Sequence, residues 1–140
     1  MRAELSDLVH RYAVGVDARD WDAVEALFTD DAVLVVPEPP RTLDPATERT
    51  VREAMAALED VVRTVHEIGA EVYDVAGDAA TGRVTGSAHH LVERSGDLLD
   101  LTWRLRYADR FRRTSEGWRF TRRELTIDVV DVRSVQKVRR

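Results

Sequence analysis

The sequence predicts one α+β domain in which helices come first and a sheet follows. Apolar residues near the start recur at steps of three and four, as they do on one face of a helix. From about residue 66 the apolar period changes to two, which is typical of strands. A length of 140 residues suits one hydrophobic core. We therefore expect a single domain over residues 1–133 and a flexible basic tail over residues 134–140.

Three helices are expected in the first half of the chain. The first covers residues 3–17, and its apolar stripe comprises Leu5, Leu8, Val9, Tyr12, Ala13 and Val16. Asp20 can cap a second helix. The buried side of that helix is expected to hold Trp21, Val24, Leu27 and Phe28. Thr50 and Glu53 have the spacing of a capping box and predict a third helix that ends near residues 64–66.

Strands are expected before and after the third helix. A first strand covers residues 32–36, after a turn at Asp30 and Asp31 and before a proline-rich loop over residues 37–49. The later strands form a meander over residues 66–75, 79–93, 98–112 and 118–132. Strand 98–112 is expected to bury Leu99, Leu101, Trp103, Leu105, Tyr107 and Phe111 on one face. The last strand is expected to share a face among Arg123, Leu125, Ile127 and Val129.

Composition narrows the possible functions. A formal net charge of -5 argues against a general nucleic-acid binder, because phosphate affinity comes mainly from clustered cations. No apolar run suits a membrane helix and the start does not read as a signal peptide, so we expect a cytoplasmic protein. The absence of cysteine excludes disulfides, a thiolate zinc site and a thiol nucleophile. No nucleotide-binding, zinc-protease or serine-hydrolase motif is present, and we expect no metal.

Asp17 and His66 are the candidate acid-base pair. Asp17 falls at the edge of the apolar stripe of the first helix, and His66 lies where the helical period gives way to a strand period. A carboxylate bonded to an imidazole fixes its tautomer and favours its protonated form, which suits acid-base work near neutral pH. Spacing alone leaves a structural interpretation open, in which Asp17 closes the first helix and His66 is a hydrogen-bonded junction residue.

Further residues are candidates for the same cavity. Tyr12 lies about one and a half helical turns before Asp17, so its phenol can reach the cavity as a hydrogen-bond donor. Arg123 shares an apolar strand face and, if buried, needs a carboxylate, a polar network or an anionic ligand. Tyr107 and Trp103 lie on the apolar face of strand 98–112 and can line the cavity. Core packing of the aromatic residues, and a one-residue shift of the Arg123 face, remain open alternatives.

The doublet His89-His90 does not suit a metal site. Adjacent strand residues point to opposite faces, so the two imidazoles cannot easily bind one ion. His90 shares its parity with Val84 and Ala88 and is the candidate for a second histidine of the pocket, with a surface or interface role as the alternative. His10 is expected on the solvated side of the first helix.

The order of several short motifs resembles a SnoaL-like domain of the nuclear transport factor 2-like superfamily. These motifs are Tyr12, Asp17, Asp20-Trp21-Asp22, Phe28, Asp30-Asp31-Ala32, Thr64-x-His66, Gly77-Asp78-Ala79, Tyr107-x-Asp109-x-Phe111 and Gly117-Trp118-Arg119-Phe120. The resemblance covers nearly the whole chain. It implies a cone-shaped barrel, in which a strongly bent mixed sheet wraps around three N-terminal helices and encloses a deep apolar pocket. It also implies cofactor-free chemistry and homodimers or homotrimers.

The resemblance also suggests roles for individual residues. Asp17 and His66 match the aspartate-histidine pair of the scytalone dehydratase branch, and Tyr12 and Arg123 resemble the tyrosine and arginine of its bile-acid 7α-dehydratase members. The position of the second histidine of scytalone dehydratase holds Val84 here. The family thus implies a dehydratase, cyclase or isomerase acting on a hydrophobic polycyclic or polyketide-like carbonyl compound. The alternative is a non-catalytic member that binds an apolar ligand or scaffolds an oligomer.

Overall fold

A computed structural model describes residues 1–37 and 47–138, and within them it contains three helices and six strands. In chain order these are α1 (Arg2–Asp17), α2 (Trp21–Glu25), β1 (Phe28–Val36), β2 (Thr47–Arg49), α3 (Val51–Ala56), β3 (Arg63–Ala76), β4 (Ala79–Arg94), β5 (Asp97–Thr114) and β6 (Gly117–Val135). The predicted α+β class is confirmed, with helices before a meander of long strands.

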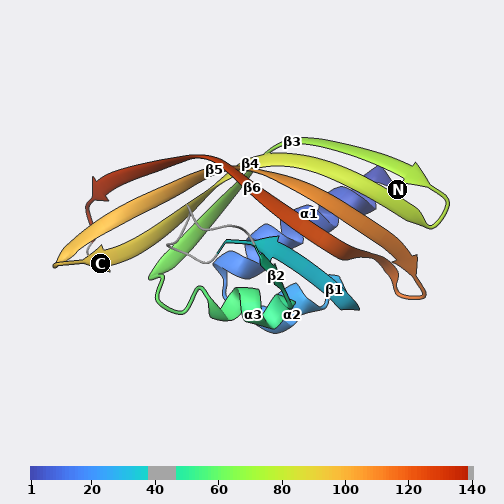
Figure 1. The fold of residues 1–140 in the computed structure, drawn as a ribbon, viewed down its shortest axis with the longest axis horizontal. Coiled ribbons are helices and arrows are strands. Elements are labelled where there is room, and N and C mark those ends of the chain that lie inside the picture. Colours follow the sequence, from blue (N-terminus) through green and yellow to red (C-terminus); the bar gives the residue numbers. More distant parts are fainter. Residues whose placement is uncertain (38–46, 139–140) are drawn as a thin grey trace.

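The six strands form one mixed sheet in the order β2-β1-β6-β5-β4-β3. Neighbouring strands are antiparallel except for β1 and β6, which are parallel. The sheet arches over the helices as a curled, open cone, and α1 runs along its concave side (Figure 1). Because β3 is an edge strand, one row of its backbone groups has no neighbouring strand and faces α1. This edge is where the candidate site is built.

The core lies between α1 and the concave face of the sheet. The predicted stripe of α1 is buried, and so are the alternating residues of β5 from Leu101 to Phe111. Asp20 caps α2 by accepting a hydrogen bond from Ala23, and the predicted capping box at the start of α3 is formed. Within residues 1–37 and 47–138, no helix is both long enough and apolar enough to span a lipid bilayer.

The third helix is shorter than predicted. The prediction placed its end near residues 64–66, but α3 ends at Ala56, and β3 begins at Arg63. Leu58 and Val61 continue the helical spacing and are buried, yet they belong to the turns that follow α3. Pairing with β4 draws the chain into the sheet, because the Val62 N–H donates to a carbonyl of β4. His66 therefore lies within a strand rather than at a helix end.

The first strands also differ from the prediction. Strand β1 begins at Phe28 rather than residue 32, so the expected turn at residues 30–31 is wrong and Phe28 lies in the sheet instead of on the second helix. A register irregularity between Phe28 and Val33 accommodates the two aspartates in the strand. Strand β2 occupies residues 47–49 of the predicted loop, and residues 38–46 of that loop lie outside the described residues.

A bulge in β6 changes which residues face the core near its end. Leu105 pairs with Ile127 whereas Arg104 pairs with Val129, so one extra residue is inserted in β6. Arg123 and Leu125 are buried as predicted, but Val129 is 53% exposed and Val130 packs against the core instead. Strand β6 continues to Val135, past the predicted domain boundary, and the flexibility of the tail stays a prediction.

Candidate active site

Asp17 is the last residue of α1 and accepts three hydrogen bonds from β3. The donors are the Thr64 hydroxyl at 3.0 Å, the His66 backbone N–H at 2.8 Å and the His66 Nδ1 at 2.6 Å. A carboxylate is otherwise disfavoured at the negative end of a helix dipole. Burial raises the pKa of Asp17, but the hydrogen bonds from His66 and Thr64 outweigh it and lower the pKa below its ordinary value. Asp17 is therefore ionised at neutral pH.

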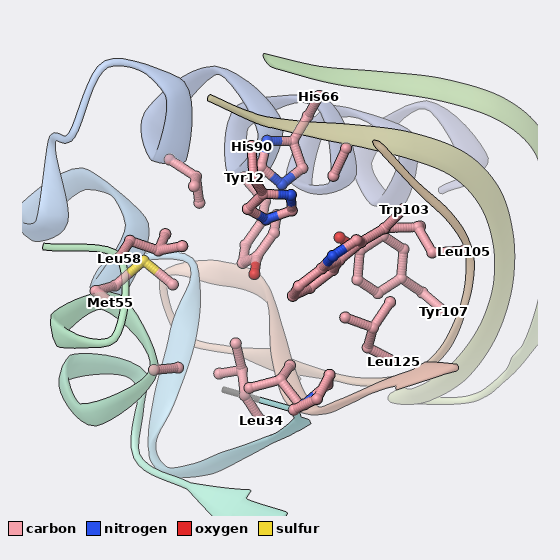
Figure 2. A pocket seen from close by; sticks show the side chains of 15 residues that line it. Tyr12, Leu34, Met55, Leu58, His66, His90, Trp103, Leu105, Tyr107 and Leu125 are labelled. Atoms are coloured by element: carbon pink, nitrogen blue, oxygen red, sulfur yellow. The ribbon is translucent and has the colours of Figure 1, made fainter. Parts of the chain in front are cut away.

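His66 connects Asp17 to an apolar cavity. Its side chain is only 9% exposed, and with Nδ1 bonded to Asp17 its Nε2 lies on the opposite side of the ring. Figure 2 shows the imidazole at the wall of the cavity, close to Tyr12 and His90. Asp17 is not among the described residues that line this cavity. It acts on the cavity through His66.

The cavity has a volume of about 40 Å³, which holds about three water molecules. Its polar or aromatic walls come from α1, β3, β4 and β5, namely Tyr12, His66, His90, Trp103 and Tyr107. The remaining wall is aliphatic and includes Leu34, Met55, Leu58, Leu105 and Leu125. Among the described residues, no group of three His, Asp or Glu side chains is arranged to hold a metal ion.

His90 lies in the cavity wall, where its ring packs against that of Trp103. It is buried, its ring centroid is 4.0 Å from that of Trp103 and 6.5 Å from that of His66, and its Nδ1 lies 3.3 Å from the Leu101 carbonyl oxygen. Burial, followed by the nearby His66 ring, lowers the pKa of His90 to about 4. His90 is thus neutral at physiological pH, and donation from Nδ1 to Leu101 would leave Nε2 as a hydrogen-bond acceptor.

His89 points to the other face of the sheet. Its Nδ1 lies 2.7 Å from Asp100 and its Nε2 lies 3.1 Å from Glu67, outside the cavity. The opposed directions of the two histidines agree with the alternation expected of a strand. His10 lies on the exposed side of α1.

Tyr12 and Tyr107 form a second polar group in the cavity. Both side chains are buried, and the ring centroids are 6.2 Å apart. Figure 2 shows both hydroxyl groups directed toward the interior of the cavity. Burial raises the pKa of each phenol, so both remain protonated and can donate a hydrogen bond at neutral pH.

Arg123 lies behind these tyrosines, outside the described lining of the cavity. Its Nε donates to Asp109 Oδ1 at 3.0 Å, and neither side chain has any exposed surface. Arg123 is buried beside a carboxylate, one of the three kinds of partner that the sequence left open, and it is not among the described residues that line the cavity. Asp109 and Thr64 were quoted within family motifs, but neither was given a role in the site. Both left a signal: Asp109 has the parity of Tyr107 and Phe111, and Thr64 has that of His66.

The depressed pKa of His90 predicts a pH-dependent stability. In the unfolded chain His90 binds a proton near pH 6.5, but in the folded chain only near pH 4. The contribution of His90 to the free energy of unfolding is therefore lost as the pH falls through this range. The whole shift corresponds to about 3 kcal/mol of unfolding free energy. The free energy of unfolding can be measured with urea at pH 7.0 and at pH 4.5. We expect His90→Gln to lack the decrease in this free energy that His90 causes between the two pH values.

The comparison with the parent chain isolates His90 from other groups. Burial raises the pKa of Asp109 to about 6, which acts in the opposite direction over nearly the same range, but Asp109 is present in both proteins. His10→Gln, at an exposed histidine, is the control for the substitution itself. An identical pH dependence in His90→Gln and the parent would show that His90 is not buried in its neutral form.

Comparisons with known proteins agree with this architecture. A putative aromatic ring hydroxylase from Novosphingobium aromaticivorans is 24% identical, with a TM-score of 0.78 over 96% of this chain and 92% of the other. A putative scytalone dehydratase from the same organism is 21% identical, with a TM-score of 0.77 over 96% and 89%. LinA-type3, a hexachlorocyclohexane dehydrochlorinase from Novosphingobium barchaimii, is 15% identical, with a TM-score of 0.79 over 99% and 94%.

At these identities the solved structures establish the fold. No curated protein matches the chain. The profile of the SnoaL-like domain, however, matches residues 1–124, which is most of the sequence. The chain therefore belongs to the family of SnoaL-like domains.

Proposed function

We propose that this protein is a cofactor-independent lyase or isomerase in which His66 moves a proton next to the carbonyl group of a hydrophobic small molecule. The observation that carries the proposal is the 2.6 Å contact between Asp17 and His66 Nδ1, which leaves Nε2 free on the side of an apolar cavity. A carboxylate that orients an imidazole in a dry pocket is a common arrangement for general acid-base catalysis.

The reaction would begin with proton abstraction. Nε2 of His66 takes the α-proton, the C–H electron pair moves into an enolate, and Asp17 stabilises the imidazolium that forms. Tyr12 donates a hydrogen bond to the enolate oxygen, a contribution on the order of 3 kcal/mol for a well-placed donor. In a dehydration, the enolate then expels a β-hydroxyl group, which leaves as water with the proton from His66. In an isomerisation, the same proton returns to another carbon.

The cavity favours a neutral, largely apolar substrate. Its described wall contains no Asp, Glu, Lys or Arg side chain, and most of it is aliphatic or aromatic. A volume of about 40 Å³ is small beside the roughly 300 Å³ or more that is usual for ligand pockets. A polycyclic or polyketide-like substrate therefore requires the wall to widen, and the flexible side chains of Met55 and Leu58 are placed to do so.

Relatives favour elimination among the possible reactions. The names scytalone dehydratase and hexachlorocyclohexane dehydrochlorinase describe loss of water and of hydrogen chloride, and the structures that carry them share this fold. An elimination needs a base, and loss of water also needs an acid that protonates the leaving hydroxyl group; His66, oriented by Asp17, can serve as both in turn. Dehydration is thus the form of the proposal that we favour over cyclisation.

The alternative of a scaffold protein receives less support from the outer sheet face. Among the described residues, that face carries ion pairs such as Arg104 with Asp131 and Arg106 with Asp128, beside scattered exposed valines such as Val129. A homodimer or homotrimer, a cytoplasmic location and the absence of a cofactor stay predictions.

Deuterium exchange tests the proposed function. The α-protons of cyclohexanone and 2-tetralone, a one-ring and a two-ring ketone, should exchange with D₂O faster in the presence of the protein, as measured by NMR. His66→Gln should remove the acceleration, whereas His10→Gln should retain it, because His10 lies on the exposed side of α1. Equal exchange by the parent and His66→Gln would contradict the proposal.

A further inference from the structure

Asp109 and Arg123 form a buried ion pair that the proposed proton transfer does not use. They face each other across β5 and β6, where they are direct register partners. Both side chains have no exposed surface, and the Nε–Oδ1 distance is 3.0 Å. Burying two charges costs free energy that mutual attraction only partly recovers, so a pair in this position calls for an explanation beyond stability.

The pair leaves most of the guanidinium group without a hydrogen bond. Asp109 engages Nε of Arg123, while Nη1, Nη2 and the second carboxylate oxygen of Asp109 have no hydrogen-bond partner within the described residues. The guanidinium carbon instead lies 3.6 Å from the ring centroid of Tyr107 and 4.4 Å from that of Tyr12. The cation is thus incompletely neutralised on the side that meets the two rings.

These are the two tyrosines whose hydroxyl groups face the cavity. Arg123 contacts these rings but is not among the described residues that line the cavity, so its charge acts on the cavity through the rings. A cation over an aromatic face is attracted to the ring and favours negative charge on the phenol oxygen, and the effect is strong where water is excluded. Burial raises the pKa of both phenols; Arg123 opposes this rise, and more strongly than Asp109 adds to it.

We propose that Asp109 and Arg123 are a positioning pair that polarises the hydroxyl groups of Tyr12 and Tyr107, so that they donate stronger hydrogen bonds to the substrate oxygen. Asp109 holds the guanidinium against the rings, and Arg123 supplies the charge. Neither residue touches the substrate. The inference rests on the proposed function, since it assigns the oxygen of that substrate to the tyrosine side of the cavity.

A double-mutant cycle on 2-tetralone exchange tests this role. The pair is removed as Asp109→Leu with Arg123→Met, which leaves no orphan charge in the core, and folding is checked by circular dichroism. In the parent background we expect kcat to fall about 10-fold, the scale of a desolvated cation–π contact, with little change in KM. With both tyrosines replaced by phenylalanine, removal of the pair should change kcat less than 2-fold. If removal of the ion pair lowered kcat by the same factor with the tyrosines and with the phenylalanines, the role of the pair would be merely structural.

Infrared spectroscopy separates this inference from the proposed function. We expect the carbonyl stretch of bound 2-tetralone to shift to lower frequency in His66→Gln, where the base is absent but both phenols remain. The shift should shrink when the ion pair is also removed. An undiminished shift would overturn the role of Asp109 and Arg123 while leaving proton transfer by His66 intact. Absence of any bound carbonyl band would contradict the proposed function and, with it, this inference.

Discussion

An Asp17→Asn variant is expected to exchange the α-protons of 2-tetralone about 10² to 10⁴ times more slowly than the parent. Asp17 can only accept a hydrogen bond from His66 Nδ1, which keeps Nε2 unprotonated toward the cavity. The amide of asparagine can donate to Nδ1 instead and so favour the tautomer with its proton on Nε2. A base in that tautomer cannot take a proton from the substrate.

The loss should appear in kcat more than in KM, because Asp17 is not in the described wall of the cavity. Thr64→Val is the matched control: it removes a 3.0 Å hydrogen bond to Asp17 without altering the tautomer of His66, and we expect less than a 10-fold effect. Activity of Asp17→Asn close to that of the parent, with the fold retained, would show that the carboxylate does not orient the base.

An Asp109→Asn variant is expected to lose about 3 to 5 kcal/mol of unfolding free energy, as is typical when one partner of a buried ion pair is removed. The substitution keeps the size of the side chain but leaves the Arg123 cation buried without a counter-charge. Urea denaturation at pH 7.5, where Asp109 is ionised in the parent, measures the difference. A loss of this size is a large part of the stability of a small domain.

Asp128→Asn provides the control for this loss. Asp128 also pairs with an arginine, Arg106, at 2.7 Å, but both partners are on the exposed face of the sheet. Exposed ion pairs contribute little, so unfolding of this variant should resemble that of the parent. If Asp109→Asn were as stable as Asp128→Asn, another group would have to stabilise the buried positive charge of Arg123.

Periodicity predicted the elements whose burial alternates regularly. Residues 98–112 alternate between apolar and charged side chains, and β5 buries the apolar set from Leu101 to Phe111. Periodicity failed where the same apolar spacing fits both a helix and the turns that are observed. Leu58 and Val61 continue a helical spacing, but the chain leaves the helix at Ala56 to pair with β4, a long-range contact that local spacing does not encode. The bulge that exposes Val129 likewise depends on the neighbouring strand.

The site could be predicted only in part, because local spacing places single residues but not the long-range contacts between them. Spacing placed Asp17 at the inner edge of its helix and His90 on an inner strand face, and both positions are found. The contact between Asp17 and His66 joins residues 49 positions apart, so only the fold brings them together. Asp109 was quoted in a motif and has the parity of the buried residues Tyr107 and Phe111, but its pairing with Arg123 was not predicted. No pattern within one strand contains that partner.

Covalent capture of the base tests the central claim most directly. With 2-bromoacetophenone, an α-halo ketone, attack by Nε2 of His66 on the α-carbon forms an N–C bond and releases bromide, and no cysteine competes for the reagent. Peptide mass spectrometry should locate one phenacyl group on His66, formed in step with the loss of 2-tetralone exchange and much slower in Asp17→Asn. A modification confined to the exposed His10 and the half-buried His89, with His66 untouched and activity lost, would contradict the account.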